Sequence, residues 1–338
     1  MIKEDLIGRE LYSDFKAIIE QINSANNIII TSHENPDGDS IGSCLAMLNY
    51  IESKGKQGEI YFFNNIPDCY KFLPGSERIN IFKDTDAKAI LTAGLIIILD
   101  VNSMARIRTV GAVIAKATCP KIMIDHHINP EPIADLTAIN SDASATGELM
   151  WQLLHIDDDY HFSTETAISI YTAVMTDTGG FRFSNTSQFA HLIAAEMLLY
   201  GIDVSKIYDE IYNQTEHKVV KQLGRTLAGS EMYSDGKLHI LTVHKQDMID
   251  LDLSPEDLNN FSENTLAVKG AIAGVLISEM RDEDVIKLSF RSKDSINIRQ
   301  IAEMYGGGGH KNAAGAKVKN MSISDLKQDI INKIAGIL

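Results

Sequence analysis

The sequence predicts an α/β protein with an N-terminal parallel sheet that carries helices on both faces, a helical linker and a smaller C-terminal α/β domain. Two patterns carry this prediction. Short apolar runs alternate with helical stretches up to residue 125, which is the order of a parallel sheet. Strand-like runs begin again near residue 230, after a stretch in which apolar residues have helical spacing. Because 338 residues suit two domains, we expect a first domain over 1–186, a linker over 187–229 and a second domain over 230–338.

Charge and composition exclude several classes of protein. The chain has 46 acidic and 31 basic residues, a net charge of −15, whereas proteins that coat long nucleic acids are usually basic. Its apolar runs are far shorter than the roughly 20 residues of a membrane helix, and the N-terminus lacks the apolar core of a signal peptide. Three cysteines without a Cys-x-x-Cys pair fit a reducing compartment. We therefore expect a cytoplasmic protein that does not contact a membrane.

In the first part of the chain, strands are assigned to short runs rich in Ile and Leu, and helices to stripes of apolar residues three or four positions apart. The clearest stripe is Ile41, Leu45 and Leu48, with Gly55 just beyond the end of its helix. Residues 64–86 have the composition of irregular structure. We expect helices over 10–25, 40–54 and 110–115, and strands over 28–32, 59–63, 95–99 and 121–124.

The remainder of the chain is first helical and then mixed. Apolar spacing predicts helices over 145–154, 164–175, 187–200, 204–212 and 216–229. The second domain is expected to have strands over 237–243, 271–280, 285–291 and 316–318, with a hairpin turn at 281–284, and helices over 298–305 and 323–337.

Candidate metal ligands follow three of the predicted strands. His33, Asp37 and Asp39 follow the first, Asp100 follows the strand over 95–99, and Asp125-His126-His127 follows the strand over 121–124. In parallel sheets ligands bind beyond the carboxyl ends of the strands, so these side chains are expected to meet. Each group also has a simpler interpretation, because Asn-Pro-Asp-Gly makes a good turn and a His pair can lie on the surface. Taken together, the three groups favour a site for a divalent cation with oxygen and imidazole ligands.

Two further residues of the first domain are candidates. Asp177 comes where the helix over 164–175 gives way to Thr-Asp-Thr-Gly-Gly. This sequence is typical of a helix end, but a carboxylate is unfavourable beside the negative end of a helix dipole, and a metal ion would explain it. Arg106 is close enough to Asp100 in sequence to reach a phosphate, and a solvated arginine is an equally good interpretation.

The second domain contains four successive glycines, Gly306–Gly309, followed by His310. Glycines allow backbone N–H groups to approach a ligand closely, as in loops that bind phosphate. The alternative is a flexible linker, which we reject because His310 and a run of small residues follow at once within a strand–helix pattern. Arg291, at the end of a predicted strand, is a candidate second cation.

These motifs resemble those of the DHH phosphoesterase superfamily with a C-terminal DHHA1 domain, and specifically its nanoRNase/pAp phosphatase group. The resemblance implies two divalent ions, Mn²⁺ before Mg²⁺ or Co²⁺. It implies that His33, Asp37 and Asp100 hold one ion and that Asp39, Asp100, His126 and Asp177 hold the other. It assigns Asp39, Asp125 and His127 to catalysis, with His127 facing the phosphate and Asp125 orienting the histidines. Substrate would be bound by Arg106, Arg291, Gly307, Gly308, Gly309 and His310.

The activity implied by the resemblance is hydrolysis of short RNA oligonucleotides to mononucleotides and dephosphorylation of pAp to AMP. Alternatives are hydrolysis of linear or cyclic dinucleotides or of polyphosphate, and a nucleotide-binding module without turnover. A homodimer is compatible with the sequence. The substitution Asp39→Ala is expected to abolish hydrolysis and to leave much of the fold intact.

Overall fold

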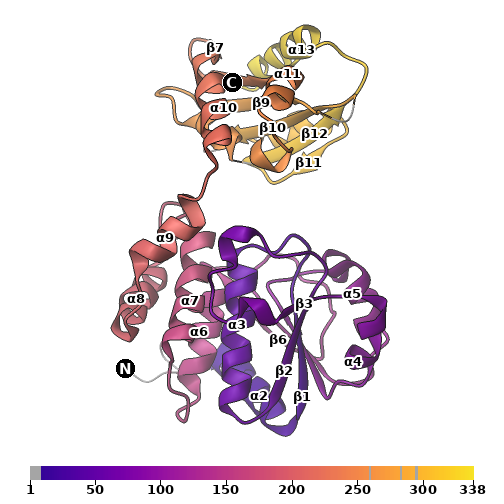
Figure 1. Ribbon diagram of the computed structural model, residues 1–338, viewed down its shortest axis with the longest axis vertical. Coiled ribbons are helices and arrows are strands. Elements are labelled where there is room, and N and C mark those ends of the chain that lie inside the picture. Colours follow the sequence, from indigo (N-terminus) through magenta and orange to yellow (C-terminus); the bar gives the residue numbers. More distant parts are fainter. Residues whose placement is uncertain (1–8, 259, 282–283, 294–295) are drawn as a thin grey trace. The chain divides into compact units, whose positions relative to one another are not determined.

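The chain folds into two units, each built around its own sheet (Figure 1). The first unit ends at Gln214, and the second runs from Thr215 to Leu338. This computed structural model describes residues 9–258, 260–281, 284–293 and 296–338. Within these ranges, no helix has both the length and the apolar character needed to cross a membrane.

The segment 187–229, expected to be a separate linker, is shared between the two units. Its helices α8 (Gln188–Met197) and α9 (Val204–Tyr212) belong to the first unit, and α10 (His217–Ala228) belongs to the second.

The first sheet has six parallel strands in the order β3-β2-β1-β4-β5-β6, which confirms the predicted fold class. The strands are β1 (Asn27–Thr31), β2 (Gln57–Phe62), β3 (Ile79–Ile81), β4 (Leu95–Leu99), β5 (Lys121–Asp125) and β6 (Leu136–Ile139). The sequence did not predict β3 or β6. Both are short edge strands, largely half-buried, and therefore lack the continuous apolar run of the central strands.

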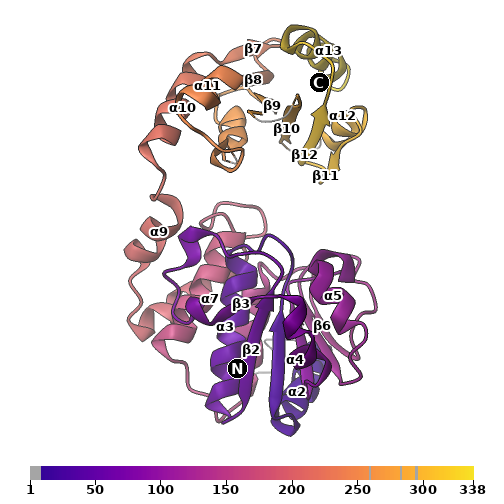
Figure 2. The ribbon, with the colours of Figure 1, turned by 45° about the vertical axis from the view of Figure 1, so that its right-hand side comes forward.

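Helices cover both faces of this sheet. Alternate residues of β1 and β4 enter different cores: Ile30 and Ile97 pack with helices on one face, and Ile29 and Ile96 pack with helices on the other. Figure 2 shows α3 and α7 on one side of the strands and α4 and α5 on the other. The helices are α2 (Arg9–Ser24), α3 (Gly38–Ser53), α4 (Ala87–Leu91), α5 (Arg108–Ile114), α6 (Thr146–Ile156) and α7 (Thr164–Asp177).

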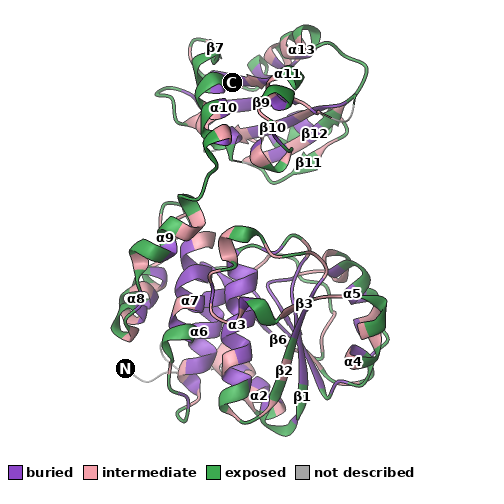
Figure 3. Cartoon of the chain, viewed as in Figure 1, coloured by how far each residue is buried: buried purple, intermediate pink, exposed green. Residues whose placement is uncertain are grey.

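Helices α3 and α7 pack closely through glycine, and most residues of both are buried (Figure 3). A Cβ atom built on Gly42 would lie 2.4 Å from the carbonyl oxygen of Ser169 and 3.1 Å from the Cβ of Ala173. Since α3 carries Asp39 and α7 ends at Asp177, this contact sets the separation of two candidate ligands.

We expect Gly42→Ala to lower the free energy of unfolding by about 1–3 kcal/mol, because the added methyl group forces the two helices apart. Urea denaturation measures the change. Gly224→Ala on α10 is the matched control: no atom lies within 4 Å of the added Cβ, and alanine gains about 0.5–1 kcal/mol over glycine within a helix. Equal stability of the two variants would contradict this description of the α3–α7 contact.

The second sheet is mixed, with strand order β11-β12-β10-β9-β8-β7. Its strands are β7 (Glu231–Tyr233), β8 (Leu238–Val243), β9 (Ala273–Glu279), β10 (Ile286–Ser292), β11 (Gly308–Gly309) and β12 (Ala313–Val318). Among the described residues of this sheet, β8 and β9 pair in parallel and the other neighbouring strands pair antiparallel. Strands β9 and β10 form the expected antiparallel pair, and residues 282–283 of the predicted hairpin turn lie outside the described residues.

Two cores flank the second sheet. One lies beneath α12 (Arg299–Glu303) and α13 (Ile323–Ala335) and contains Leu288 and Phe290 of β10. The other lies beneath α10 and α11 (Lys245–Asp250) and takes in β8 and β9. Strand β7 and helix α11 were not predicted, since both are short, β7 has no fully buried residue and α11 exposes four of its six residues.

Candidate metal centre

The carboxyl ends of β1, β4 and β5 lie side by side and bring one group of candidate ligands together. The Nε2 atom of His33 lies 3.7 Å from Oδ2 of Asp37 and 3.3 Å from Oδ2 of Asp100. The Nδ1 atom of His33 lies 2.7 Å from the carbonyl oxygen of Glu34, which can only accept, so Nδ1 carries a proton. Nε2 is buried and has no hydrogen-bond partner among the described residues. It therefore points toward two carboxylates. Burial lowers the pKa of His33, but Asp100 and Asp37 outweigh burial and raise it to about 10, so a cation that binds at Nε2 would displace a proton.

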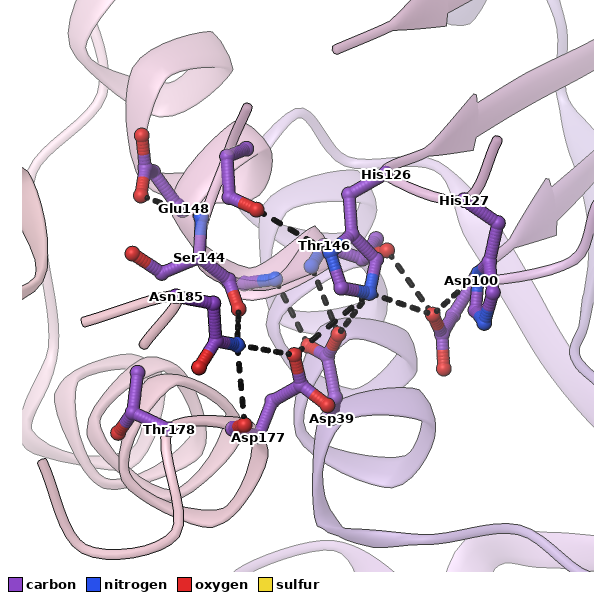
Figure 4. Close-up of polar contacts among 12 residues, drawn as sticks. Asp39, Asp100, His126, His127, Ser144, Thr146, Glu148, Asp177, Thr178 and Asn185 are labelled. Carbon is purple, nitrogen blue, oxygen red and sulfur yellow. Dashed lines mark hydrogen bonds and ion pairs between the residues drawn. The ribbon is translucent and has the colours of Figure 1, made fainter. Parts of the chain in front are cut away.

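A second group surrounds His126 (Figure 4). Its Nε2 atom lies 3.7 Å from a carboxylate oxygen of each of Asp39, Asp100 and Asp177. Its Nδ1 atom lies 3.2 Å from the carbonyl oxygen of Ala143 and donates to it, which again directs the Nε2 lone pair toward the carboxylates.

Asp100 belongs to both groups. Its Oδ2 faces His33 and its Oδ1 faces His126, so one carboxylate lies between the two histidines. The residue has a φ of 58°, in the left-handed region that is uncommon for residues other than glycine. Strain of this kind persists where the surrounding structure imposes it, and here it directs the carboxylate toward both imidazoles.

Asp39 is held by the N-terminus of α6. Its Oδ2 accepts from the backbone N–H of Thr146 at 2.7 Å, and its Oδ1 accepts from that of Gly147 at 2.8 Å. Burial, together with the nearby carboxylates of Asp100 and Asp177, raises the pKa of Asp39 despite these two bonds. The carboxylate of Asp39 is therefore held in place by two backbone donors, and the carboxylates around it make its negative charge unfavourable.

The arrangement fits two divalent cations. Four Asp and two His side chains converge, and the pairs within each group are 3.3–3.7 Å apart. Ligand atoms that share an ion at about 2.1 Å lie roughly 3.0–3.4 Å from one another, so small side-chain movements would complete the coordination. The uncompensated carboxylates and the unpartnered Nε2 of His33 are the groups that such ions would satisfy.

We expect Mn²⁺ to stabilise the protein more at pH 8 than at pH 5.5. Burial, with the carboxylates of Asp100 and Asp37, raises the pKa of Asp177 to about 6, so protons compete with the metal at the lower pH. At a hundredfold excess over its Kd, one ion adds about 2.7 kcal/mol. Thermal unfolding in Mn²⁺ and in EDTA at both pH values measures this, and equal shifts would contradict it.

The third histidine, His127, shares Asp100 with the other two, its Nδ1 lying 3.5 Å from Oδ1 of Asp100, but its nearest partners differ. His127 donates from Nδ1 to Oδ1 of the buried Asp125 at 2.8 Å, and its Nε2 lies 3.3 Å from Nη1 of Arg106. Burial opposes protonation of His127, but Asp125 and Asp100 outweigh it and raise its pKa. His127 therefore lies at the border of the cluster, next to a guanidinium group and partly open to solvent.

Three polar residues of the site were missed in the sequence. Thr146 donates from Oγ1 to Oδ1 of Asp100 at 3.2 Å, and Asn185 donates from Nδ2 to Oδ2 of Asp177 at 3.2 Å. Glu148 accepts from the backbone N–H of Ser144 at 2.9 Å and so fixes the start of α6. The stretch Ser-Ala-Thr-Gly-Glu before an apolar helix was a detectable signal for a helix N-terminus. Asn185 lies in a loop and gave no such signal.

The remaining predicted residues lie together in the second unit. Arg291 pairs in the sheet with Ala313, whose carbonyl oxygen accepts from the N–H of His310 at 2.8 Å. Cβ atoms on Gly307 and Gly309 would lie 2.0 Å and 2.5 Å from backbone oxygens of β12, so packing alone requires glycine there. Gly308 is exposed and has open space around it, which leaves it available to a ligand.

Comparisons with known proteins agree with this organisation. Residues 27–176 match the DHH family N-terminal domain, and residues 235–338 match the DHHA1 domain. The bifunctional oligoribonuclease and PAP phosphatase NrnA of Thermus thermophilus is 28% identical over 91% of this chain and 89% of its own length. The Bacillus subtilis protein of that name is 25% identical over 91% and 94%. The crystal structure of an exopolyphosphatase-related protein from Bacteroides fragilis superposes with a TM-score of 0.89 at 29% identity, covering 96% of this chain and 97% of that one.

Proposed function

This chain belongs to the DHH family of phosphoesterases and carries a DHHA1 domain, and we propose that it hydrolyses short RNA oligonucleotides to mononucleotides and pAp to AMP. The observation that carries the proposal is the convergence of four Asp and two His side chains at the strand ends of the first unit. The choice of substrates is supported by relatives named as bifunctional oligoribonuclease and PAP phosphatase, which align with nine-tenths of the chain.

We propose two divalent ions at this cluster, with Mn²⁺ favoured over Mg²⁺ and Co²⁺. His33, Asp37 and Asp100 would hold one, and Asp39, Asp100, His126 and Asp177 would hold the other. The ions, when bound, supply positive charge to the phosphoryl oxygens and make a nucleophile available from water near neutral pH. The mixed carboxylate and imidazole donors support this range of metals.

The role proposed for His127 follows from its two neighbours. Oδ1 of Asp125 accepts a hydrogen bond from Nδ1–H of His127 and fixes the ring orientation, so Nε2 is the atom that takes up or releases a proton near the substrate. The guanidinium of Arg106, 3.3 Å from this Nε2, offers several donors to a phosphate. We assign His127 to proton transfer, Asp125 to its orientation and Arg106 to phosphate binding.

The second unit is assigned to recognition of the part of the substrate that is not cleaved. Arg291, His310 and the exposed Gly308 lie at the β10–β12–β11 side of its sheet, and we propose that they, with Gly307 and Gly309, bind that part. The proposal assigns catalysis to the segment 1–186, a linking role to 187–229 and substrate binding to 230–338. It places the protein in the cytoplasm as a homodimer. Light scattering on purified protein would test the dimer.

A turnover panel with Mn²⁺ tests the proposed function. The substrates are pAp, RNAs of two to five residues, linear and cyclic dinucleotides, polyphosphate and pyrophosphate. We expect the highest kcat/KM with the short RNAs and pAp. A preference for pyrophosphate or polyphosphate over every nucleotide would refute the proposal, and no turnover of any substrate would favour a nucleotide-binding module.

A further inference from the structure

Glu148 is a buried carboxylate that has no part in the proposed reaction. It lies in the first turn of α6 and is 3% exposed. Its hydrogen-bond partners are neutral: the backbone N–H of Ser144 donates to Oε2 at 2.9 Å, and the side chains of Ser187 and Gln152 donate at 3.4 Å and 3.5 Å. Burial raises the pKa of Glu148 despite the bonds from Ser144 and Ser187, so its charge is costly. The dipole of α6 favours a negative charge here but offsets only part of that cost.

A single peptide group joins Glu148 to His126. The N–H of this group belongs to Ser144 and donates to Oε2 of Glu148 at 2.9 Å (Figure 4). Its carbonyl oxygen belongs to Ala143 and accepts from Nδ1 of His126 at 3.2 Å. Because both bonds are made by one planar, conjugated group, a negative charge at its N–H strengthens its carbonyl oxygen as an acceptor. The carboxylate of Glu148 therefore acts on the imidazole whose Nε2 faces three candidate metal ligands.

His33 provides a comparison within the same site. Its Nδ1 also bonds to a backbone carbonyl oxygen, that of Glu34, at 2.7 Å. The N–H of that peptide group, which belongs to Asn35, donates at 2.9 Å to Oδ1 of Asn64, a neutral amide. The two histidines thus have backbone acceptors of the same kind, but only the acceptor of His126 has a buried carboxylate behind it.

We propose that Glu148 is a positioning residue of the metal centre, which orients His126 and strengthens its Nε2 as a metal ligand through the peptide group between Ala143 and Ser144. The inference rests on the proposed function, because it concerns the ions that this function requires. A hydrogen-bonded acceptor at Nδ1 fixes the tautomer and the ring orientation, and a stronger acceptor makes Nε2 more basic. An ion bound at His126 would in turn lower the cost of the buried charge on Glu148.

The test measures Mn²⁺ binding to the metal-free protein by calorimetry. For E148A, we expect the Kd of one ion to rise about 10–100-fold, the usual effect of removing a group that orients a metal ligand. E148Q keeps the volume and an acceptor oxygen, and its Kd should rise roughly fivefold, because hydrogen bonds to neutral oxygens are weaker than those to carboxylates. The control S163A removes a comparable bond at the start of α7, where Ser163 accepts from the N–H of Thr166 at 3.2 Å, and should match the wild type. Equal Kd values for all three variants would refute the inference.

The variant H126A shows whether the effect passes through His126. This variant keeps the group of candidate ligands around His33, and adding E148A to it should not raise the Kd of Mn²⁺ any further, because the imidazole that Glu148 orients is absent. An equal rise in both backgrounds would refute the inference, since Glu148 would then act through the start of α6 and its bonds to Asp39.

Failure of the inference can be told apart from failure of the proposed function. If the wild type binds Mn²⁺ but cleaves no nucleotide, the proposed activity fails and the Kd values still decide the role of Glu148. If the wild type or H126A binds no Mn²⁺, the NMR resonance of the Nδ1 proton of His126 in EDTA decides it, because this resonance moves downfield as the hydrogen bond strengthens. A resonance farther upfield in E148Q than in S163A supports the inference, and the same position in both refutes it.

Discussion

Asp100→Asn is expected to lower kcat for pAp and for short RNA by at least about a thousandfold. Asp100 is the carboxylate that lies between His33 and His126, so neutralising it removes a negative charge from both groups of candidate ligands at once. Asparagine keeps the side-chain shape, the oxygen that accepts from Thr146 and the tolerance for a positive φ. The variant therefore removes charge while leaving the local geometry intact.

Calorimetric titration with Mn²⁺ and thermal unfolding in EDTA complete this experiment. We expect weaker Mn²⁺ binding and an unfolding temperature within about 3 °C of the wild type. Asp84→Asn, an exposed position of the same unit, is the matched control and should behave as the wild type. Full activity of Asp100→Asn would show that this carboxylate does not act in the reaction.

The sequence alone predicts the central strands and the proximity of the candidate ligands, because both depend on patterns within a few neighbouring residues. Strands β1, β4 and β5 are buried on both faces, so each is a continuous apolar run, and polar residues directly after such runs are easily seen. The rule that parallel strands end at one edge then places those residues together. Strands β3 and β6 depend on pairing with a neighbour and have no comparable local signal.

The glycine run shows what the sequence could not provide. Its composition predicts backbone that approaches a ligand, yet Gly307 and Gly309 are needed for packing against β12, and only Gly306 and Gly308 of the run are open. Glycine permits close approach to a ligand and to a neighbouring strand equally well, so composition does not distinguish the two. Thr146 and Asn185 were missed for a related reason. The sequence signals a helix start near Thr146, but the contacts of these residues with Asp100 and Asp177 join positions 46 and 8 residues apart, and no short motif records such contacts.

From the sequence, Asp39→Ala is expected to remove activity and to leave much of the fold intact. From the structure, we expect the substitution to lower the free energy of unfolding as well as the activity. The carboxylate of Asp39 accepts from the backbone N–H groups of Thr146 and Gly147, and removing it leaves both donors buried without that partner. We expect kcat to fall by at least about a thousandfold, as for Asp100→Asn.

Asp39→Asn separates the two effects, since it loses the charge and keeps one acceptor oxygen for the start of α6. In EDTA we expect Asp39→Ala to be less stable than Asp39→Asn by about 1–3 kcal/mol, the cost of leaving a buried donor unsatisfied. Both variants should be inactive, because each lacks the negative charge at the group around His126. Urea denaturation measures the difference. Equal stability of the two variants would mean that the helix contact of Asp39 is incidental, and then Asp39 would serve only the metal centre.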